Sequence, residues 1–211
     1  YPLIKESLNY FRDKIFHPPG EDPIQTYEGA EAIDDAIQFL EKQKPVNELE
    51  YNEHLAQACK DHVNDIGIKG LTTHEGSDDK NIADRLENYC EWDGSLSESL
   101  DFGFKEAENI ILNLIIDDGV KDRYQRYNLF NNNFKYIGIG AGPHREYTHC
   151  VVIGYAMNIR PLNSEPRNMY EFIKDYLQIN KDKKKINNPF QEEEPDAPDN
   201  TISVTIVKNK K

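Results

Sequence analysis

The sequence predicts an α+β fold, and three observations support this prediction. Several segments in the first half carry apolar residues at every third or fourth position, which is the spacing of an amphipathic helix. Residues 134–140 and 147–156 are rich in Val, Ile and aromatic residues, and Gly142 and Pro143 stand between them as a turn. A helix-rich half followed by neighbouring strands favours helices packed on an antiparallel sheet.

The helical pattern occurs six times before the strands. A proline pair ends the first segment, Pro45 ends the second, and Asn52 is a suitable N-cap for the third. The fifth segment is apolar on so many sides that this helix is expected to be largely buried. Residues 91–99 are rich in turn-forming residues and are expected to lie outside regular structure. The six segments are residues 3–16, 28–43, 52–66, 82–89, 104–116 and 122–130.

The C-terminal quarter of the chain is expected to lie outside the packed domain. Residues 169–179 fit a further helix, and the basic run 181–185 follows it. Residues 191–199 are rich in Glu, Asp and Pro and are typical of a linker that buries no core. Residues 201–207 alternate as a strand does. We expect this strand either to begin a further domain or to add to the edge of another sheet.

Composition limits the classes of partner. The 211 residues carry a formal net charge of -13, which argues against nucleic acid and anionic membrane surfaces as main partners. No apolar run approaches the roughly 20 residues of a membrane-spanning helix. The chain starts at Tyr1 rather than Met, so the sequence does not test for a leader peptide.

Three cysteines, Cys59, Cys90 and Cys150, are too few for a disulfide framework. We expect them to be small buried hydrophobic residues, with one bridge and one free thiol as the alternative. His62 lies on the apolar stripe of the third helix. It is expected to be a hydrogen-bonded histidine at the edge of the core rather than a ligand.

Several short motifs resemble one known family. Residues 62–67 (His-Val-Asn-Asp-Ile-Gly) and 69–71 (Lys-Gly-Leu), followed by His74 and residues 76–78 (Gly-Ser-Asp), resemble the CAP superfamily, also called SCP-like domains. This superfamily includes cysteine-rich secretory proteins, antigen 5 and plant pathogenesis-related proteins of class 1. The resemblance is closest to a protist branch, and it covers roughly residues 24–157. Residues 115–120, 134–139, 142–144 and 150–151 also carry it.

The resemblance implies a three-layer α-β-α sandwich with a central antiparallel sheet. It also implies a cleft with two histidines and two acidic residues, which in some members binds zinc or another divalent ion. His74 matches the first histidine and Glu98 the glutamate. The second acidic residue has no firm match, and Asp117 and Asp118 are the nearest in sequence.

The chain departs from the family pattern at the second histidine. Tyr124-Gln125-Arg126 stands where the family has Gly-His-Arg, so Gln125 replaces an imidazole with an amide that is a poor zinc ligand. Tyr124 is expected to fill part of the cleft, because the family keeps a glycine there. His144 and His149 are the alternatives for the missing imidazole.

We therefore expect a vestigial pocket with no catalytic residue, no metal-ligand set and no cofactor, with zinc as the alternative. Its members are His74, Glu98, Gln125, Asp118 and Tyr124.

The predicted domain organisation has five parts. They are an N-terminal helical extension (1–23), the CAP domain (24–160), a C-terminal helix with the basic segment (161–190), an acidic linker (191–200) and a lone strand (201–211).

Three functions are compatible with these features. The first is a non-catalytic CAP-domain protein that binds other proteins or forms part of a larger assembly inside a cell. The cilium of a protist is the example, because the Asn-, Lys-, Ile- and Tyr-rich composition is similar to that of AT-rich protist genomes. The second is a secreted, extracellular CAP protein that binds lipid or sterol. The third is a divalent-metal-dependent hydrolase that uses His74 and Glu98, although no Ser or Cys nucleophile with a partnered base is evident.

Overall fold

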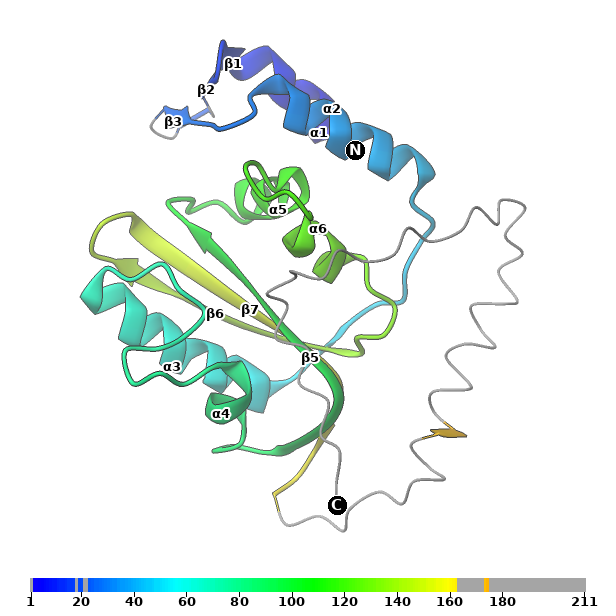
Figure 1. Ribbon diagram of the computed structural model, residues 1–211, viewed down its shortest axis with the longest axis vertical. Coiled ribbons are helices and arrows are strands. Elements are labelled where there is room, and N and C mark those ends of the chain that lie inside the picture. The colour runs from blue at the N-terminus through cyan, green and yellow to red at the C-terminus, as the bar shows by residue number, and fades with distance from the viewer. Residues whose placement is uncertain (1, 18, 21–22, 163–172, 175–211) are drawn as a thin grey trace.

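The computed structural model describes residues 2–17, 19–20, 23–162 and 173–174 (Figure 1). A central sheet carries helices on both faces. Helices α3 (Glu53–Lys69) and α4 (Ile82–Leu86) cover one face, and α5 (Ala107–Ile116) and α6 (Tyr124–Leu129) cover the other. The α+β class and the α-β-α layers that the sequence predicts are confirmed. Helices α1 (Pro2–Ser7) and α2 (Ala30–Lys42) pack outside α5 as an additional layer.

The central sheet has the strand order β4-β6-β7-β5. Strand β7 pairs antiparallel with both neighbours, so the predicted hairpin is confirmed. The turn predicted at Gly142 and Pro143 is wrong: these residues pair with Cys150 and His149, and residues 145–147 make the turn. The short β4 pairs parallel with β6, so the sheet is mixed rather than wholly antiparallel. The strands are β4 (Glu50–Tyr51), β5 (Glu91–Phe102), β6 (Tyr136–His144) and β7 (Thr148–Arg160).

Strand β5 corrects the expectation that residues 91–99 lie outside regular structure. The register against β7 shifts between Asp93 and Leu96, and Gly94 adopts φ 82°. The turn-forming residues therefore make a bulge inside a 12-residue strand instead of ending it. Glu98 gains a rigid position in the sheet as a result.

The N-terminal segment also differs from the helix expected over residues 3–16. Helix α1 ends at Ser7, the 3-10 helix η1 (Leu8–Tyr10) follows, and a small antiparallel sheet begins at Phe11. Asp13 turns the chain at φ 56°, and the rings of Phe11 and Phe16 stack at 4.9 Å. This cross-strand aromatic pair stabilises strands in place of further helix. The strands are β1 (Phe11–Arg12), β2 (Ile15–Phe16) and β3 (Ile24–Gln25).

Helix α3 lies unusually close to the sheet. Asn52 caps it by accepting a hydrogen bond from the Leu55 amide at 3.0 Å, as the sequence predicts. A Cβ atom added at Gly138 of β6 would lie 2.3 Å from the backbone nitrogen of Ala56. The absence of a side chain at Gly138 therefore allows the helix backbone to rest on the strand.

Helix α5 is less buried than its apolar sequence predicts. Ile110, Leu114 and Ile116 are buried, but Ile111 is 40% exposed. The outer side of the helix packs in part against α1 and α2, and the rest of it lines an open groove.

The three cysteines are buried and free, as expected. Among the helices of the described residues, none has both the length and the apolar character that crossing a membrane requires. The segments predicted at 169–179, 181–185, 191–199 and 201–207 lie outside the described residues, apart from Ile173 and Lys174, which are helical. The predicted domain boundaries stay a prediction.

Candidate functional site

The loop of residues 71–81 places His74 against Glu98 of β5. The Nδ1 atom of His74 lies 2.9 Å from Oε1 of Glu98, and its Nε2 atom lies 3.1 Å from the Tyr124 hydroxyl. The rings of His74 and Tyr124 meet edge to face at 6.0 Å. Three of the five residues predicted for the pocket are thus brought together, and both ring nitrogens of His74 are engaged by protein groups.

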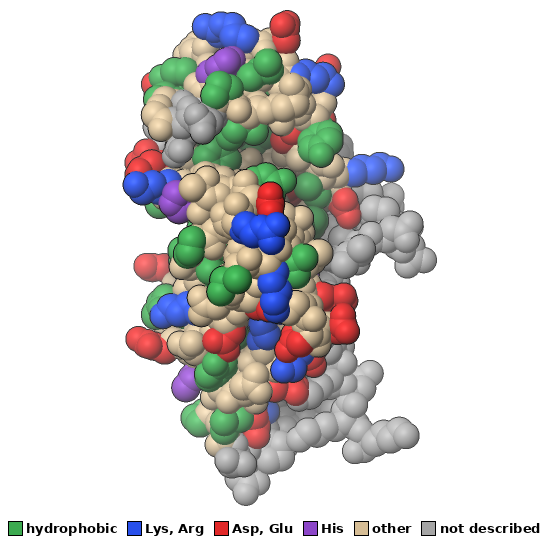
Figure 2. Space-filling model, turned by 90° about the vertical axis from the view of Figure 1, so that its left-hand side faces the viewer, with side chains coloured by type: hydrophobic (Ala, Val, Ile, Leu, Met, Phe, Trp, Pro, Cys, Tyr) green, Lys and Arg blue, Asp and Glu red, His purple; other side chains and the backbone are tan. Residues whose placement is uncertain are grey.

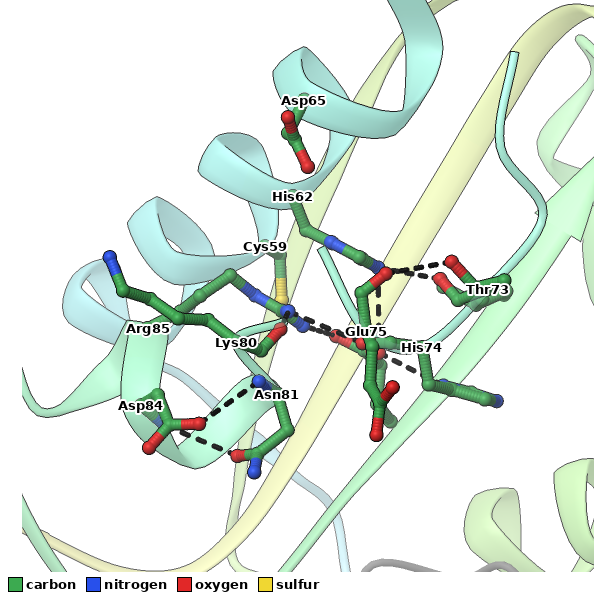
Figure 3. Close-up of polar contacts among 12 residues, drawn as sticks. Cys59, His62, Asp65, Thr73, His74, Glu75, Lys80, Asn81, Asp84 and Arg85 are labelled. Atoms are coloured by element: carbon green, nitrogen blue, oxygen red, sulfur yellow. Dashed lines mark hydrogen bonds and ion pairs between the residues drawn. The ribbon is translucent and has the colours of Figure 1, made fainter. Parts of the chain in front are cut away.

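Arg85 of α4 completes this cluster from the opposite side of the carboxylate. Its guanidinium donates to Oε2 of Glu98 at 2.5 Å and to the carbonyl oxygens of Lys80 and His74 at 2.8 and 3.3 Å. Arg85 and Glu98 are both buried. The ion pair therefore ties α4, the loop and β5 together, and both of its side chains are largely shielded from water. Figure 3 shows Arg85 extending from α4 toward Lys80 and His74 of the loop.

The charges of the cluster are set by burial and by these contacts. Burial raises the pKa of Glu98, but the hydrogen bond with His74 and the Arg85 charge outweigh it, so the pKa lies below its usual value. Burial raises the pKa of Tyr124 to about 12, with the charges of Asp117 and Glu98 adding to it. Tyr124 is therefore a neutral donor, and Glu98 is an ionised acceptor.

Gln125 points away from His74. Its Oε1 atom accepts a hydrogen bond from the backbone amide of Leu100 at 3.0 Å, and its Nε2 atom donates to Asp117 at 3.3 Å. Leu100 belongs to β5, which is an edge strand of the sheet. The residue at the position of the family's second histidine therefore satisfies a backbone donor at the sheet edge.

The two neighbouring aspartates have separate structural roles. The buried Asp117 accepts from the backbone amides of Gln125 and Arg126 at 3.0 and 3.3 Å, which caps the start of α6. Asp118 accepts from the amides of Tyr27 and Glu28 at 2.7 and 2.8 Å. Asp118 thus lies outside the His74–Glu98 cluster and binds the N-terminal segment.

The other histidines of interest do not supply the missing imidazole. His144 accepts from the amides of Glu146 and Tyr147, and its Nε2 lies 2.9 Å from the Leu71 carbonyl oxygen. His149 lies at the start of β7 in the same hairpin. His62 is buried and bonds the Thr73 carbonyl at 2.9 Å, which agrees with the role predicted for it.

A zinc ion does not fit these donors. Both oxygens of Glu98 are taken by Arg85 and His74, and both nitrogens of His74 are taken by Glu98 and Tyr124. The Arg85 guanidinium also puts a fixed positive charge where a cation would bind. Within the described residues, no group of three or more His, Cys, Asp or Glu side chains is arranged to hold a metal.

Sequence reasoning missed two members of the site. Arg85 falls on the buried stripe of α4 between Ile82 and Leu86, and a charged residue on an apolar stripe is the signal that would have found it. Asn128 donates to the Glu98 carbonyl oxygen at 3.3 Å, and its Oδ1 accepts from the Ser97 hydroxyl at 2.9 Å. Both residues support the strand that carries Glu98.

The family model described as the cysteine-rich secretory protein family, CAP, matches residues 6–155. The chain belongs to this family. A comparison with curated proteins finds no match. The CAP assignment agrees with the α-β-α layers of the fold.

Two solved structures are similar to this CAP chain. One is an extracellular protein containing a SCP domain from Bacillus anthracis, with a TM-score of 0.44, 14% identity, and coverage of 54% of this chain and 35% of that chain. The other is an outer surface protein from Borrelia burgdorferi, with a TM-score of 0.46, 17% identity, and coverage of 62% of this chain and 96% of that chain. This chain therefore spans about a third of the first structure's length.

Proposed function

We propose that this protein is a non-catalytic CAP domain that binds other proteins as part of a larger assembly. The observation that carries the proposal is that the polar groups of the former cleft are engaged by one another. Glu98 is bound by Arg85 and His74, and His74 is bound in turn by Tyr124. A metal ligand needs a free lone pair aimed at the ion, whereas His74 is held here between Glu98 and the Tyr124 hydroxyl. The pKa of that hydroxyl is raised to about 12, which disfavours its activation as a nucleophile.

The thiols also support a non-catalytic function. Burial raises the pKa of Cys59 and Cys150, and it raises that of Cys90 to about 11. Each cysteine is therefore a protonated thiol at neutral pH, whereas a nucleophilic cysteine needs a lowered pKa.

A groove on the outer side of α5 supports binding to a partner. It has a volume of about 820 Å³, and side chains from α1, α2, α5 and Phe130 line it. Most of its lining is aliphatic, including Leu40, Ile111 and Ile115, while Glu41 and Glu108 stand among them. An apolar floor with charged residues beside it suits a protein partner better than bulk water.

The charge distribution favours protein over nucleic acid as the partner. Acidic and basic side chains are intermixed on the face in Figure 2, and the chain is acidic as a whole. We expect the assembly inside a cell, with the protist cilium as the example and an extracellular location as the alternative. Immunofluorescence of the native protein with and without permeabilisation of the cells distinguishes the two locations.

Zinc titration of the purified chain tests the non-catalytic part of the proposal. We expect no saturable binding at micromolar zinc, because Arg85 and Tyr124 occupy the donor atoms. Micromolar or tighter binding that His74→Ala abolishes would favour the hydrolase instead.

A matched pair of variants tests the binding part. Ile111 in the groove and Ile139 on β6 are 40% and 41% exposed. In tagged native protein, Ile111→Asp is expected to release the chain from its assembly, whereas Ile139→Asp leaves it bound. The proposal fails if the wild-type protein elutes as a free monomer from native extracts, or if both variants behave alike.

The same apolar groove favours lipid or sterol binding as a second candidate. A direct binding assay with a fluorescent sterol and a fluorescent fatty acid separates the candidates. Saturable binding that Ile111→Asp removes would support this candidate, and no binding of either probe would exclude it.

A further inference from the structure

The open apolar groove runs along the outer side of α5, between this helix and the N-terminal layer. Its volume is about 820 Å³, and its lining extends over most of α5, from Ala107 to Ile115. Figure 1 shows α1 and α2 on this side of α5, away from the sheet, and they supply Ile4 and Leu40 to the walls. Ile111 in the middle is 40% exposed, so the described residues leave the centre of the groove open to solvent.

The same chain carries an uncovered apolar stripe after β7. The sequence of residues 169–179 predicts a helix, and Ile173 and Lys174, the two of them that the structure describes, are helical. The apolar residues of this segment recur at intervals of three and four, which places them along one side of such a helix. Ile173 is 46% exposed, so the stripe is uncovered where it is described. The members of the stripe are Met169, Phe172, Ile173, Tyr176 and Leu177.

The groove and the stripe agree in length. Ala107 and Ile115 are eight residues apart on α5, and Met169 and Leu177 are eight residues apart in the segment. At about 1.5 Å of rise per residue, each extends about 12 Å along its helix. An amphipathic helix laid in a groove between helices buries both apolar surfaces, and the burial of apolar surface is what drives such docking.

One end of the groove lies near the last part of β7. Phe130 lines the groove, and a four-residue turn, 131–134, leads from it toward β6. The next residue, Lys135, donates its amide hydrogen to the carbonyl oxygen of Ala156 in β7 at 3.0 Å. The turn keeps Phe130 close to Lys135, and therefore close to Ala156.

The residues after β7 are numerous enough for the segment to reach the groove of its own chain. Strand β7 ends at Arg160, four residues or about 13 Å beyond Ala156. Residues 161–168 connect Arg160 with Met169, and in an extended conformation they span up to roughly 30 Å. A tether of this length gives the attached segment an effective concentration in the millimolar range at the groove. A separate protein seldom reaches that concentration, so the tether favours the chain's own segment.

We propose that residues 169–179 dock as a helix in the groove of the same chain, with the Ile173 side of the helix facing Ile111. The basic run 181–185, which follows the segment, complements the charge of Glu108, which is exposed at the groove. A protein that binds the groove must displace this segment first, so the segment is a built-in competitor. The docking itself does not rest on the proposed function, because it needs no other molecule.

Cysteine cross-linking of the purified full chain tests the docking. Ile111→Cys places a thiol at the centre of the groove, and it is combined in turn with Phe172→Cys, Ile173→Cys and Tyr176→Cys. Mild oxidation joins two thiols only when their Cα atoms come within about 7 Å of each other. The three native cysteines are buried and stay unreactive. We expect a disulfide within one chain for at least one pair, seen as a monomer of altered mobility on a non-reducing gel.

Two controls separate docking from chance collisions of a tethered segment. Ile139→Cys on β6 replaces Ile111→Cys at a site that is 41% exposed and lies outside the groove, and cross-linking is expected to be roughly tenfold slower there. Ile173→Asp, added to the pair of Ile111→Cys and Tyr176→Cys, should slow cross-linking by roughly tenfold, because it puts a charge on the apolar stripe. Lys174→Asp, beside the stripe, should leave the rate nearly unchanged.

Three outcomes overturn the proposal. The first is that no pair cross-links, and the second is that Ile139→Cys reacts as fast as Ile111→Cys or that Ile173→Asp has no effect. The third is that cross-linked dimers replace monomers, which means that a second copy of the chain fills the groove. Ala107→Cys, one turn earlier on α5 and exposed, repeats the test if Ile111→Cys disturbs folding. None of these outcomes decides whether another protein binds the groove, because the assay contains only this chain.

Discussion

At the residue scale, one carboxylate organises the polar cluster around His74. Glu98 binds Arg85 and His74 and lies close to His62. The Arg85 contact gives the buried Glu98 a fixed countercharge. Glu98 therefore joins α4, the 71–81 loop and β5 through its contacts with Arg85 and His74.

Replacing Glu98 with glutamine should lower the free energy of unfolding by about 3–5 kcal/mol, because it leaves the buried Arg85 without its countercharge. Urea unfolding followed by circular dichroism measures the change. Asp78→Asn is the control, because the Asp78–Lys80 pair is exposed and its loss should leave stability nearly unchanged. Similar small changes in both variants would show that the Glu98 cluster is not structural.

Asp101 predicts an unusual pH dependence. It is buried in β5, its Oδ2 accepts from Asn113 at 2.6 Å and its Oδ1 has no partner among the described residues, and burial raises its pKa from 3.8 to about 7. Below pH 3.8, Asp101 is protonated in both the folded and the unfolded chain, and it does not reduce the stability of the fold. As the pH rises toward 7 the unfolded chain ionises first, so stability falls by up to about 1.4 kcal/mol per pH unit.

Unfolding measured at about pH 5 and about pH 8 should therefore show lower stability at the higher pH. Asp101→Asn should reduce this difference, and Asp117, whose pKa is also raised by burial, should account for part of what remains. Glu98 acts in the opposite sense and only under acid conditions, because its lowered pKa removes stability as the pH falls. An unchanged pH dependence in Asp101→Asn would refute this assignment.

At the scale of elements, α6 covers the edge strand β5. Gln125 accepts from the Leu100 amide, and Asn128 donates to the Glu98 carbonyl oxygen. An open strand edge is a place where another chain can pair, and polar side chains that occupy its backbone groups prevent this. The amide at position 125 is thus explained by the sheet edge rather than by a ligand.

The contact between α3 and β6 gives an element-scale prediction. Gly138→Ala should lower the free energy of unfolding by about 3 kcal/mol, since the new methyl group would meet the backbone of Leu55 and Ala56 rather than a movable side chain. Thermal unfolding measures the shift. Ile139→Val at the next, exposed position should change stability by less than about 0.5 kcal/mol, and equal effects would mean that the helix can move away freely.

At the scale of the whole molecule, ion pairs hold the N-terminal layer on the sandwich. Arg123 pairs with Glu28 at 2.6 Å and with Asp35 at 3.1 Å, and Arg126 pairs with Asp35 at 2.9 Å. The hydrogen bond from Arg123 lowers the pKa of Glu28 to about 2. The segment that begins the chain is therefore bound to the loop before α6, close in space to the former cleft.

Asp118→Ala should loosen this layer, because it removes the acceptor for the Tyr27 and Glu28 amides. Each hydrogen bond to a charged group contributes about 1.5–3 kcal/mol when buried, and less at this partly exposed position. Hydrogen exchange should show faster exchange of these two amides by roughly tenfold, since about 1.4 kcal/mol corresponds to a factor of ten. Asp122→Ala, in the same loop, is the control and should leave both amides protected.

The local elements follow from the sequence alone. The apolar spacing of α2 and α3 and the cap at Asn52 are set by contacts within a few residues, and these parts of the fold are predictable. The hairpin is predictable too, but not its turn, because Gly142 and Pro143 pair with β7 inside β6. His74 and Glu98 follow instead from the resemblance to the CAP family, because the motifs around them keep the order of the family.

What these residues do depends on tertiary packing. Residues 91–99 form a strand despite their turn-forming residues, because β5 pairs with β7 along its length. The turn-forming residues between Asp93 and Leu96 are accommodated as a bulge in this pairing. Packing also brings Glu98 within hydrogen-bond distance of Arg85, and Gln125 within that distance of the edge strand β5. It places Asp118 against the backbone of the N-terminal segment. These partners come from different elements, and no local pattern in the sequence brings them within hydrogen-bond distance.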